Sequence, residues 1–235
     1  MFSSSDRAAV LMRCGNCSQA LGGLPDDTVF PCTECLTAWC LGDGELVPRA
    51  MEVFAMEEDG LAALPFWILD AELEIVRRIT RMAECASPVQ LPRHFEEAGE
   101  RGLRETADPP RRATIFVPAF LTDRPLSLGR KVTSLELAPS GRTVRGLRAP
   151  GGCITADDGL LLAKGVAIFS ETGGRTHLAL LELDLRPVHL RLALVGCRAE
   201  EQGFRVAGQT LLIPYTTIAD AEEIMAFSGL SREGR

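Results

Sequence analysis

The chain has 235 residues, 46% of them hydrophobic, which is enough for one small module and one larger domain with a sizeable core. Its formal net charge of −7 and its pI of about 5.1 argue against a protein that binds nucleic acid broadly through the phosphate backbone. Aromatic residues make up only 6% of the chain, so aliphatic packing has to dominate the core.

The beginning of the chain carries no sign of secretion. Residues 1–10 show no apolar periodicity, and we expect them to form a flexible tail. They also lack the continuous apolar run of a signal peptide. Later apolar runs are interrupted by charged side chains, as at Lys164, so we expect no membrane span. The sequence therefore predicts a soluble, cytoplasmic protein.

Residues 11–44 carry the strongest motif of the chain, two Cys-x-x-Cys pairs with fourteen residues between them. Two such turns on adjacent hairpins can direct four sulfurs at one ion, which is the tetrahedral coordination of structural Zn²⁺. The spacing is just short of the usual range for four-cysteine zinc sites. Turn-forming residues fill the loop between the pairs, followed by a short strand candidate at Thr28–Phe30. We predict a zinc ribbon whose ligands are Cys14, Cys17, Cys32 and Cys35.

Two other chemistries fit the same cysteines. Iron in a rubredoxin-like site also suits four sulfurs, and the thiols could instead form disulfides or a redox pair. Zinc is favoured because no position is left open for a substrate. Cys40 has the wrong spacing for a ligand and is interpreted as a free thiol. Trp39 is expected to cover the site, to dock the ribbon on the next domain or, by default, to pack in the core. Cys85, Cys153 and Cys197 are interpreted as small apolar residues in a reducing compartment.

A turn at residues 42–44 is the expected boundary between the ribbon and a β-rich domain over residues 45–230. The first strand of this domain is predicted over Leu46–Met56. Residues 61–82 are ambiguous, because apolar and acidic residues alternate from Leu69 to Ile75 with the period of a half-buried strand, yet a helical stripe fits as well. We choose the strand.

Residues 86–112 are expected to form a polar excursion from this domain. They contain Pro, Gly and many charged residues. A short helix near His94–Glu105 is compatible with the sequence, although the apolar periodicity there is poor. His94 is interpreted as a solvated loop residue.

From residue 112 onward the pattern is typical of β structure, with Gly-containing turn signals between apolar runs. The sequence Arg186-Pro187 is expected to separate two long strands. The chain then ends in a short helix over Thr217–Phe227, with Thr217 as its cap and Gly229 as its stop. The predicted strands are Ala113–Phe120, Val132–Leu137, Arg142–Ala149, Leu160–Phe169, Thr176–Leu185, Val188–Arg198, Gly203–Ala207 and Thr210–Tyr215.

The predicted fold class is therefore mainly β: an N-terminal zinc ribbon plus a larger antiparallel β-rich domain with a short C-terminal helix. The ribbon at residues 14–35, followed by Leu-Pro-Phe-Trp at 64–67 and Val-Pro-Ala-Phe at 117–120, resembles a loosely defined group of uncharacterised bacterial zinc-ribbon proteins. The resemblance implies an architecture, and that group has no established activity to carry over.

Residues for catalysis are scarce. The chain contains no phosphate-binding, nucleophile-elbow or His-Glu-x-x-His motif. Two of the three histidines, His177 and His189, lie on strand candidates, and Asp157-Asp158 lies in a predicted turn. Cys153 follows two glycines but has no evident base to activate it. We expect no catalytic residues, and an enzyme is the less favoured interpretation.

Three functions remain. The favoured one is a non-catalytic accessory or scaffold subunit that binds other proteins, since ribbons are rigid and offer hairpin edges for strand addition. The alternative is nucleic-acid binding in transcription or replication, which the acidic ribbon disfavours; Arg142, Arg145 and Arg148 would alternate between the faces of a strand. The third is electron transfer through iron at the four cysteines.

Overall fold

The computed structural model describes residues 12–42, 44–56, 60–81, 103–140, 147, 149–172, 178–227 and 229. These residues form a mainly β protein with a cysteine-rich N-terminal segment and three α-helices, one of them C-terminal, which confirms the predicted fold class. In this part of the chain, no helix is both long enough and apolar enough to cross a membrane.

Two small hairpins form the cysteine-rich end. The first pairs β1 (Met12–Arg13) with β2 (Ala20–Leu21), and the second pairs β3 (Val29–Cys32) with β4 (Thr37–Gly42). β4 also pairs with β5 (Glu45–Phe54), the strand predicted over Leu46–Met56. The chain turns between Gly42 and Glu45, which face each other.

A single sheet runs from the second hairpin into the body, whereas β1 and β2 form a separate two-stranded sheet. The last four residues of β5 pair in parallel with β8 (Leu178–Ala199), which joins β3 and β4 to the remaining strands. β8 is also bonded to β9 (Gly203–Val206), and β9 to β10 (Leu212–Pro214). Hydrogen bonding is therefore continuous across the turn that the sequence suggests as a boundary.

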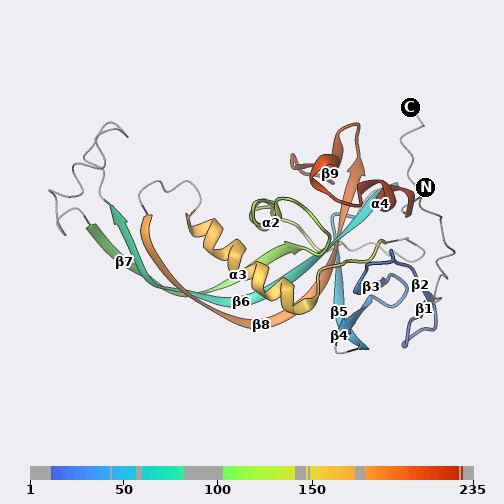
Figure 1. The fold of residues 1–235 in the computed structure, drawn as a ribbon, viewed down its shortest axis with the longest axis horizontal. Coiled ribbons are helices and arrows are strands. Elements are labelled where there is room, and N and C mark those ends of the chain that lie inside the picture. Colours follow the sequence, from blue (N-terminus) through green and yellow to red (C-terminus); the bar gives the residue numbers. More distant parts are fainter. Residues whose placement is uncertain are drawn as a thin grey trace, which may run out of the picture.

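The longest elements form a curved arm, defined here as β6 (Ala62–Arg81), β7 (Leu103–Pro118) and the paired length of β8. β6 lies in the middle and is antiparallel to both neighbours. Figure 1 shows the three strands sweeping away from the cysteine-rich end, with α3 (Ala156–Thr172) along their inner side.

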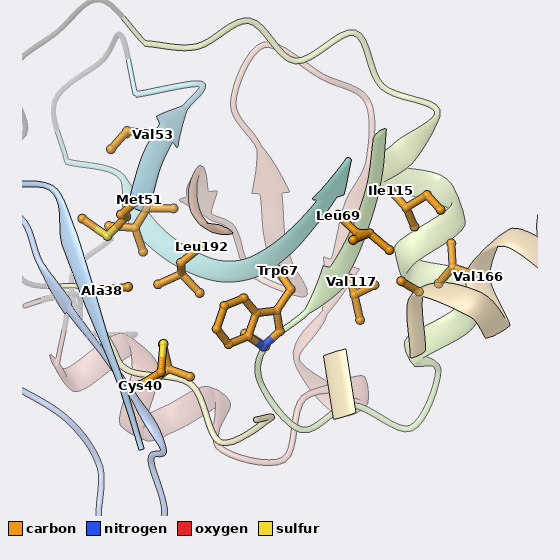
Figure 2. Close-up of a cluster of buried hydrophobic side chains, with 14 of the residues drawn as sticks. Ala38, Cys40, Met51, Val53, Trp67, Leu69, Ile115, Val117, Val166 and Leu192 are labelled. Carbon is orange, nitrogen blue, oxygen red and sulfur yellow. The ribbon is translucent and has the colours of Figure 1, made fainter. Parts of the chain in front are cut away.

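β6 resolves the ambiguity of residues 61–82 in favour of a strand. Its first half is buried on both faces, which explains the unbroken apolar run there. Trp67 and Leu69 point into a core shared with β4, β5 and α3, shown in Figure 2. Phe66 and Ile68 point into a second core on the other face, with α2 (Pro125–Thr133) and the C-terminal segment.

Two predicted strands do not form. Leu160–Phe169 lies inside α3, whereas Val132–Leu137 begins in the last turn of α2 and continues as turn and irregular backbone. One side of α3 packs against the sheet and α2, but Leu161 and Ile168 on its other side are apolar and exposed, so the sequence shows little amphipathic periodicity. Arg130 on α2 lies 4.9 Å from the centre of the Phe169 ring on α3.

The predicted break at Arg186-Pro187 is wrong, because β8 is one strand of 22 residues. Pro187 opposes Ala71 of β6, and in the described part of the chain no other strand pairs with this part of β8. A proline is tolerated in a strand whose outer edge needs no donor. The excursion predicted over 86–112 is also shorter at its end, because residues 103–112 belong to β7.

The C-terminal segment contains a short 3₁₀ turn, η2 (Tyr215–Thr217), followed by α4 (Ala221–Phe227). The helix begins later than predicted because Thr217 donates its hydroxyl to Pro214 O and does not cap it. Several expectations lie outside the described residues: those for residues 1–10, 86–102 and 142–146, Cys85, His94 and His177.

Candidate metal centre

The four predicted ligands converge on one point. Cys14 and Cys17 lie in the turn after β1, Cys32 is the last residue of β3, and Cys35 lies in the turn before β4. All four sulfurs lie within 4.8 Å of one another. It is the only such group of three or more potential metal ligands within the described residues.

The sulfur spacing suits a tetrahedral ion. Cys14 Sγ lies 3.4 Å from Cys35 Sγ, and Cys17 Sγ lies 3.5 Å from Cys32 Sγ, so each close pair joins one turn to the other. Metal–sulfur bonds of about 2.3 Å give a tetrahedron with edges of roughly 3.8 Å. A disulfide would need about 2.05 Å, and all four are free cysteines. The group can therefore hold a metal ion, with zinc and iron both compatible with four thiolates.

Trp39 covers one side of the site, in agreement with one of its expected roles. Its indole Nε1–H donates to Cys14 Sγ at 3.2 Å. The ring also lies directly on Gly15, where an added Cβ would come within 2.5 Å of it. Gly15 is therefore required for this cover, a role that the Cys-x-x-Cys pattern alone does not reveal.

Hydrogen bonds favour the thiolate form of Cys14. Burial raises the pKa of this thiol, but donors from the backbone of Cys17, the Trp39 indole and the backbone of Asn16 outweigh burial and lower the pKa to about 6. Burial instead raises the pKa of Cys32 to about 12. Binding of a cation would therefore meet an ionised Cys14 at neutral pH and displace the proton of Cys32.

The two turns repeat one backbone feature. Ser18 and Leu36 each follow the second cysteine of a pair, and both have a left-handed conformation, with φ of +59° and +52°. This conformation is uncommon for residues other than glycine. Because the left-handed conformation recurs at equivalent positions of the two turns, we infer that it is needed to direct the cysteine sulfurs of each turn at the common point.

The cysteine-rich end is bonded to a distant segment around residues 147–153. Thr28 and Val29 both donate their amides to Gly152 O, at 2.7 and 2.8 Å, and Gly152 N donates back to Val29 O. The Thr33 hydroxyl, next to Cys32, donates to Leu147 O at 2.9 Å. The site is thus held against the body and is not an independent appendage.

Cys40 and Cys153 stay apart from the four ligands. Cys40 is buried in the core beside Ala38, and burial raises its pKa to about 11. Burial also raises the pKa of the half-buried Cys153, and the charges of Asp27 and Asp220 act in the same direction. Neither thiol has the low pKa of an activated nucleophile.

The glycines before Cys153 have a packing role. An added Cβ at Gly151 would lie 2.3 Å from Asp27 Oδ2, and one at Gly152 would lie 2.7 Å from Ala119 O. These close approaches let residues 151–152 bond to β3, which explains the glycine pair without any catalytic function.

The other candidate residues do not gather into a site. His189 is exposed on β8 opposite Asp70. Asp157 and Asp158 belong to the first turn of α3, where Thr155 Oγ1 accepts the amide of Asp158. This capping interaction, visible as Thr-x-x-Asp before an apolar run, is the sequence signal that would have identified α3 as a helix.

Comparison with protein-family models, with curated proteins and with solved structures gives no match to this chain. The resemblance to bacterial zinc-ribbon proteins therefore stays a prediction. Function has to be argued from the geometry.

Proposed function

We propose that the chain is a non-catalytic scaffold or accessory subunit, in which one structural Zn²⁺ holds the N-terminal hairpins and the sheet behind them binds other proteins. The observation that carries this proposal is the convergence of four thiols from two turns within 4.8 Å. Four protein ligands complete the coordination of zinc and leave no position for a substrate.

The surroundings of the site support a structural task. Cys14 and Cys32 are buried, and Leu21 and Phe30 pack beside them. In small modules of this kind, metal binding supplies folding free energy of order ~10 kcal/mol. Such an ion would stabilise the hairpins, and through β5 it would fix the edge of the large sheet.

Elemental analysis of the purified, unheated chain tests whether zinc is bound. We expect one zinc per chain. Cys17→Ser removes one ligand and should lower both the zinc content per chain and the melting temperature. Cys153→Ser is the matched control, since this thiol lies outside the cluster and should leave the metal content unchanged. A red, iron-containing protein would instead favour electron transfer. The proposal would be refuted if the purified chain contained no metal, or if removal of the metal left its melting temperature unchanged.

The proposed binding of other proteins is tested by affinity capture of partner proteins from the native host, followed by reconstitution of the complex from purified components. A partner identified with the tagged chain should bind it again when both are pure, in buffer of moderate salt. The same partner should be lost after removal of the metal with a chelator. Salt-sensitive retention on heparin, with no reconstituted protein complex, would favour nucleic-acid binding over the proposed role.

A further inference from the structure

The arm has two outer strands, β7 and β8, and each has an edge without a neighbouring strand among the residues that the structure describes. β7 pairs with β6 alone, and β8 pairs with β6 alone over Leu178–Arg191. The other partners of β8, which are β5 and β9, begin only at Leu192 and Cys197. Such an edge offers backbone donors and acceptors to a further strand.

Proline residues distinguish the two edges. On β7, Pro109-Pro110 interrupt the middle of the edge, and proline obstructs the pairing of a further strand there. On β8, residues 178–186 contain no proline, and Pro187 ends this run. An added strand can therefore follow β8 over residues 178–186 and no further.

Pro187 also shows which backbone groups of β8 face outward. It lies directly opposite Ala71 of β6. Its ring nitrogen carries no hydrogen and has no room against a paired strand, so it faces the open side. Backbone groups of an antiparallel pair alternate between the two sides of each strand. Those of Leu181, Leu183 and Leu185 therefore face outward as well, where a further strand can bond to them.

The side chains of these three leucines lie on the inner face of the arm. Leu185 is buried in the core that the sheet shares with α3, and Leu183 packs against the same core. Leu181 lies opposite Arg78, whose guanidinium is bound to α3. Leu181 and Leu183 are only half-buried. A strand beside β8 would extend this apolar face, so its inward side chains should be aliphatic.

The outer face of the same edge is acidic. Asp184 lies on this face, and its carboxylate is bound to Arg186 at 2.8 Å. The same arginine is shared with Glu74 and Glu72 of β6, at 3.5 and 3.9 Å. One guanidinium does not neutralise three carboxylates, and the side chain of Asp184 remains 45% exposed.

Glu182 adds to this negative charge. It is exposed and lies opposite Arg77 of β6, but Arg77 donates two hydrogen bonds to Glu105 of β7, at 2.8 and 3.3 Å. Opposite charges on directly opposed residues of two strands stabilise the pair. A strand beside β8 is therefore favoured when its outward side chains are lysine or arginine.

We propose that β8 binds an extended segment of a protein partner in which aliphatic residues alternate with lysine or arginine. The segment adds a fourth strand to the arm, with its aliphatic side chains beside the three leucines and its basic side chains beside Glu182 and Asp184. A second copy of β8 lacks this chemistry, because it brings the same two carboxylates. The inference rests on the proposed function, for which it specifies the surface and the class of partner.

The test uses the full wild-type chain and a synthetic peptide, as long as residues 178–186 and capped at both ends, in which lysine and valine alternate. Fluorescence anisotropy of the labelled peptide should show saturable binding, and the same peptide with glutamate in place of lysine should not bind. Two further peptides carry N-methyl groups on the amides of every valine or of every lysine. Because a paired strand turns only alternate amides toward its neighbour, one of these two peptides should bind and the other should not.

Glu182→Lys should weaken binding of the lysine–valine peptide about threefold to tenfold, because it replaces an attraction at the edge with a repulsion. The matched control is Glu201→Lys, which makes the same change of charge at an exposed residue in the turn between β8 and β9. It should bind the peptide like the wild type. Equal weakening by both variants would count against the proposed edge.

Residue-resolved amide hydrogen exchange of the wild type gives a second reading that needs no variant. In the free chain the amides of Leu183 and Leu185 should exchange faster than that of Asp184, which faces β6, and the peptide should slow them. Slow exchange at both leucines without peptide would mean that another segment or a second copy covers the edge.

That result would overturn the proposal, as would failure of the lysine–valine peptide to bind or binding of both methylated peptides. A chain that captures and reconstitutes with a protein partner but does not bind the peptide would refute this inference and leave the proposed function standing.

Discussion

Trp39 donates a hydrogen bond to one of the four cysteines of the candidate metal centre, and this bond can be removed without replacing any of the four cysteines. In Trp39→Phe the bond to Cys14 Sγ is lost while an aromatic ring remains over Gly15. We expect metal to leave about tenfold faster, since groups that bond to ligands typically tune metal affinity by 10–100-fold. Competition with a coloured chelator measures this rate.

Trp67→Phe is the control for that change. Its indole donates to Ile154 O at 2.9 Å in the core, far from the cysteines in the chain. It should lower the stability of the body and leave the transfer of metal unchanged. Equal effects of both substitutions on the metal would show that Trp39 acts through general stability alone.

Asp27 gives stability a dependence on pH. Burial raises the pKa of this carboxyl to about 6, and the charges of Asp220 and Asp26 add to the shift, against hydrogen bonds from Leu24 and Gly151. The folded state therefore holds the proton more tightly than the unfolded state. The contribution of Asp27 to stability is complete below about pH 4, where both states are protonated, and is lost as the pH rises through about 6.

Asp27→Asn removes the pH-dependent contribution of this carboxyl. Denaturant titration between pH 4 and 7 gives the free energy of unfolding of the wild type and of the variant. Subtracting one from the other cancels the effect of thiol protonation, which both proteins share. We expect the variant to gain stability relative to the wild type as the pH rises from 4 to 6. A constant difference over that range would mean that the pKa of Asp27 is not raised by folding.

At this scale the sequence located the four thiols but not their environment. A Cys-x-x-Cys turn is a local feature, so its spacing alone predicts that its sulfurs can share an ion. The contacts of Gly15 with Trp39 and of Thr33 with Leu147 depend on which strands pair. Pairing between strands that are far apart in the chain cannot be predicted from any short stretch of residues.

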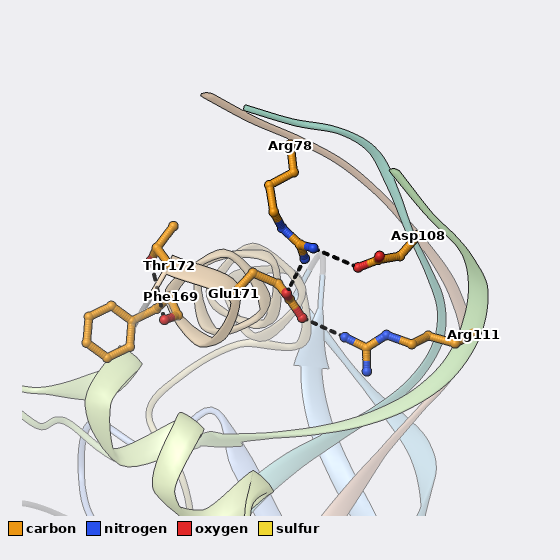
Figure 3. Close-up of polar contacts among 6 residues, drawn as sticks. All are labelled: Arg78, Asp108, Arg111, Phe169, Glu171 and Thr172. Carbon is orange, nitrogen blue, oxygen red and sulfur yellow. Dashed lines mark hydrogen bonds and ion pairs between the residues drawn. The ribbon is translucent and has the colours of Figure 1, made fainter. Parts of the chain in front are cut away.

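Among the elements, α3 is fastened to the arm by a network of ion pairs shown in Figure 3. Glu171 near its end accepts from Arg78 at 2.7 Å and from Arg111 at 2.6 Å, and Arg78 also faces Asp108 at 2.9 Å. The side chains of Arg78 and Glu171 are only 10% and 12% exposed. Loss of one partner therefore leaves a poorly hydrated charge.

Glu171→Gln is expected to lower the free energy of unfolding by about 1–3 kcal/mol, measured by denaturant titration. The matched control is Glu105→Gln, which removes an ion pair with Arg77 at the surface of the same arm. Exposed pairs contribute about 0–1 kcal/mol, so this change should have a small effect. If both substitutions cost the same, the network does not hold α3.

Strands and helices were predicted with unequal success for a physical reason. β6 was identified by alternation, because its second half has one solvated face. In Leu160–Phe169 the apolar residues surround the helix, and an apolar run between turn signals suggested a strand. β8 was divided at Pro187 because the sequence does not reveal that the outer side of this segment is open.

In the whole molecule, the C-terminal helix meets the cysteine-rich end. The Phe227 ring lies on Gly22 so closely that an added Cβ there would be 2.3 Å away. Phe227→Ala should therefore cost about 1–3 kcal/mol, less than a fully buried phenylalanine, and should speed amide hydrogen exchange in the loop over residues 22–28, between β2 and β3. Phe169→Ala, a half-buried ring on α3, is the control that should leave this loop protected.

The order in which the strands come together has a consequence for biosynthesis. β8 joins β5 to β6, so the centre of the large sheet cannot assemble until residue 199 has left the ribosome, and β9 and β10 are added after it. The four cysteines emerge within the first 35 residues. If the four thiols hold the proposed ion, a nascent chain can bind it before the sheet forms, and translation under metal starvation should yield more aggregated chain, measured as the insoluble fraction.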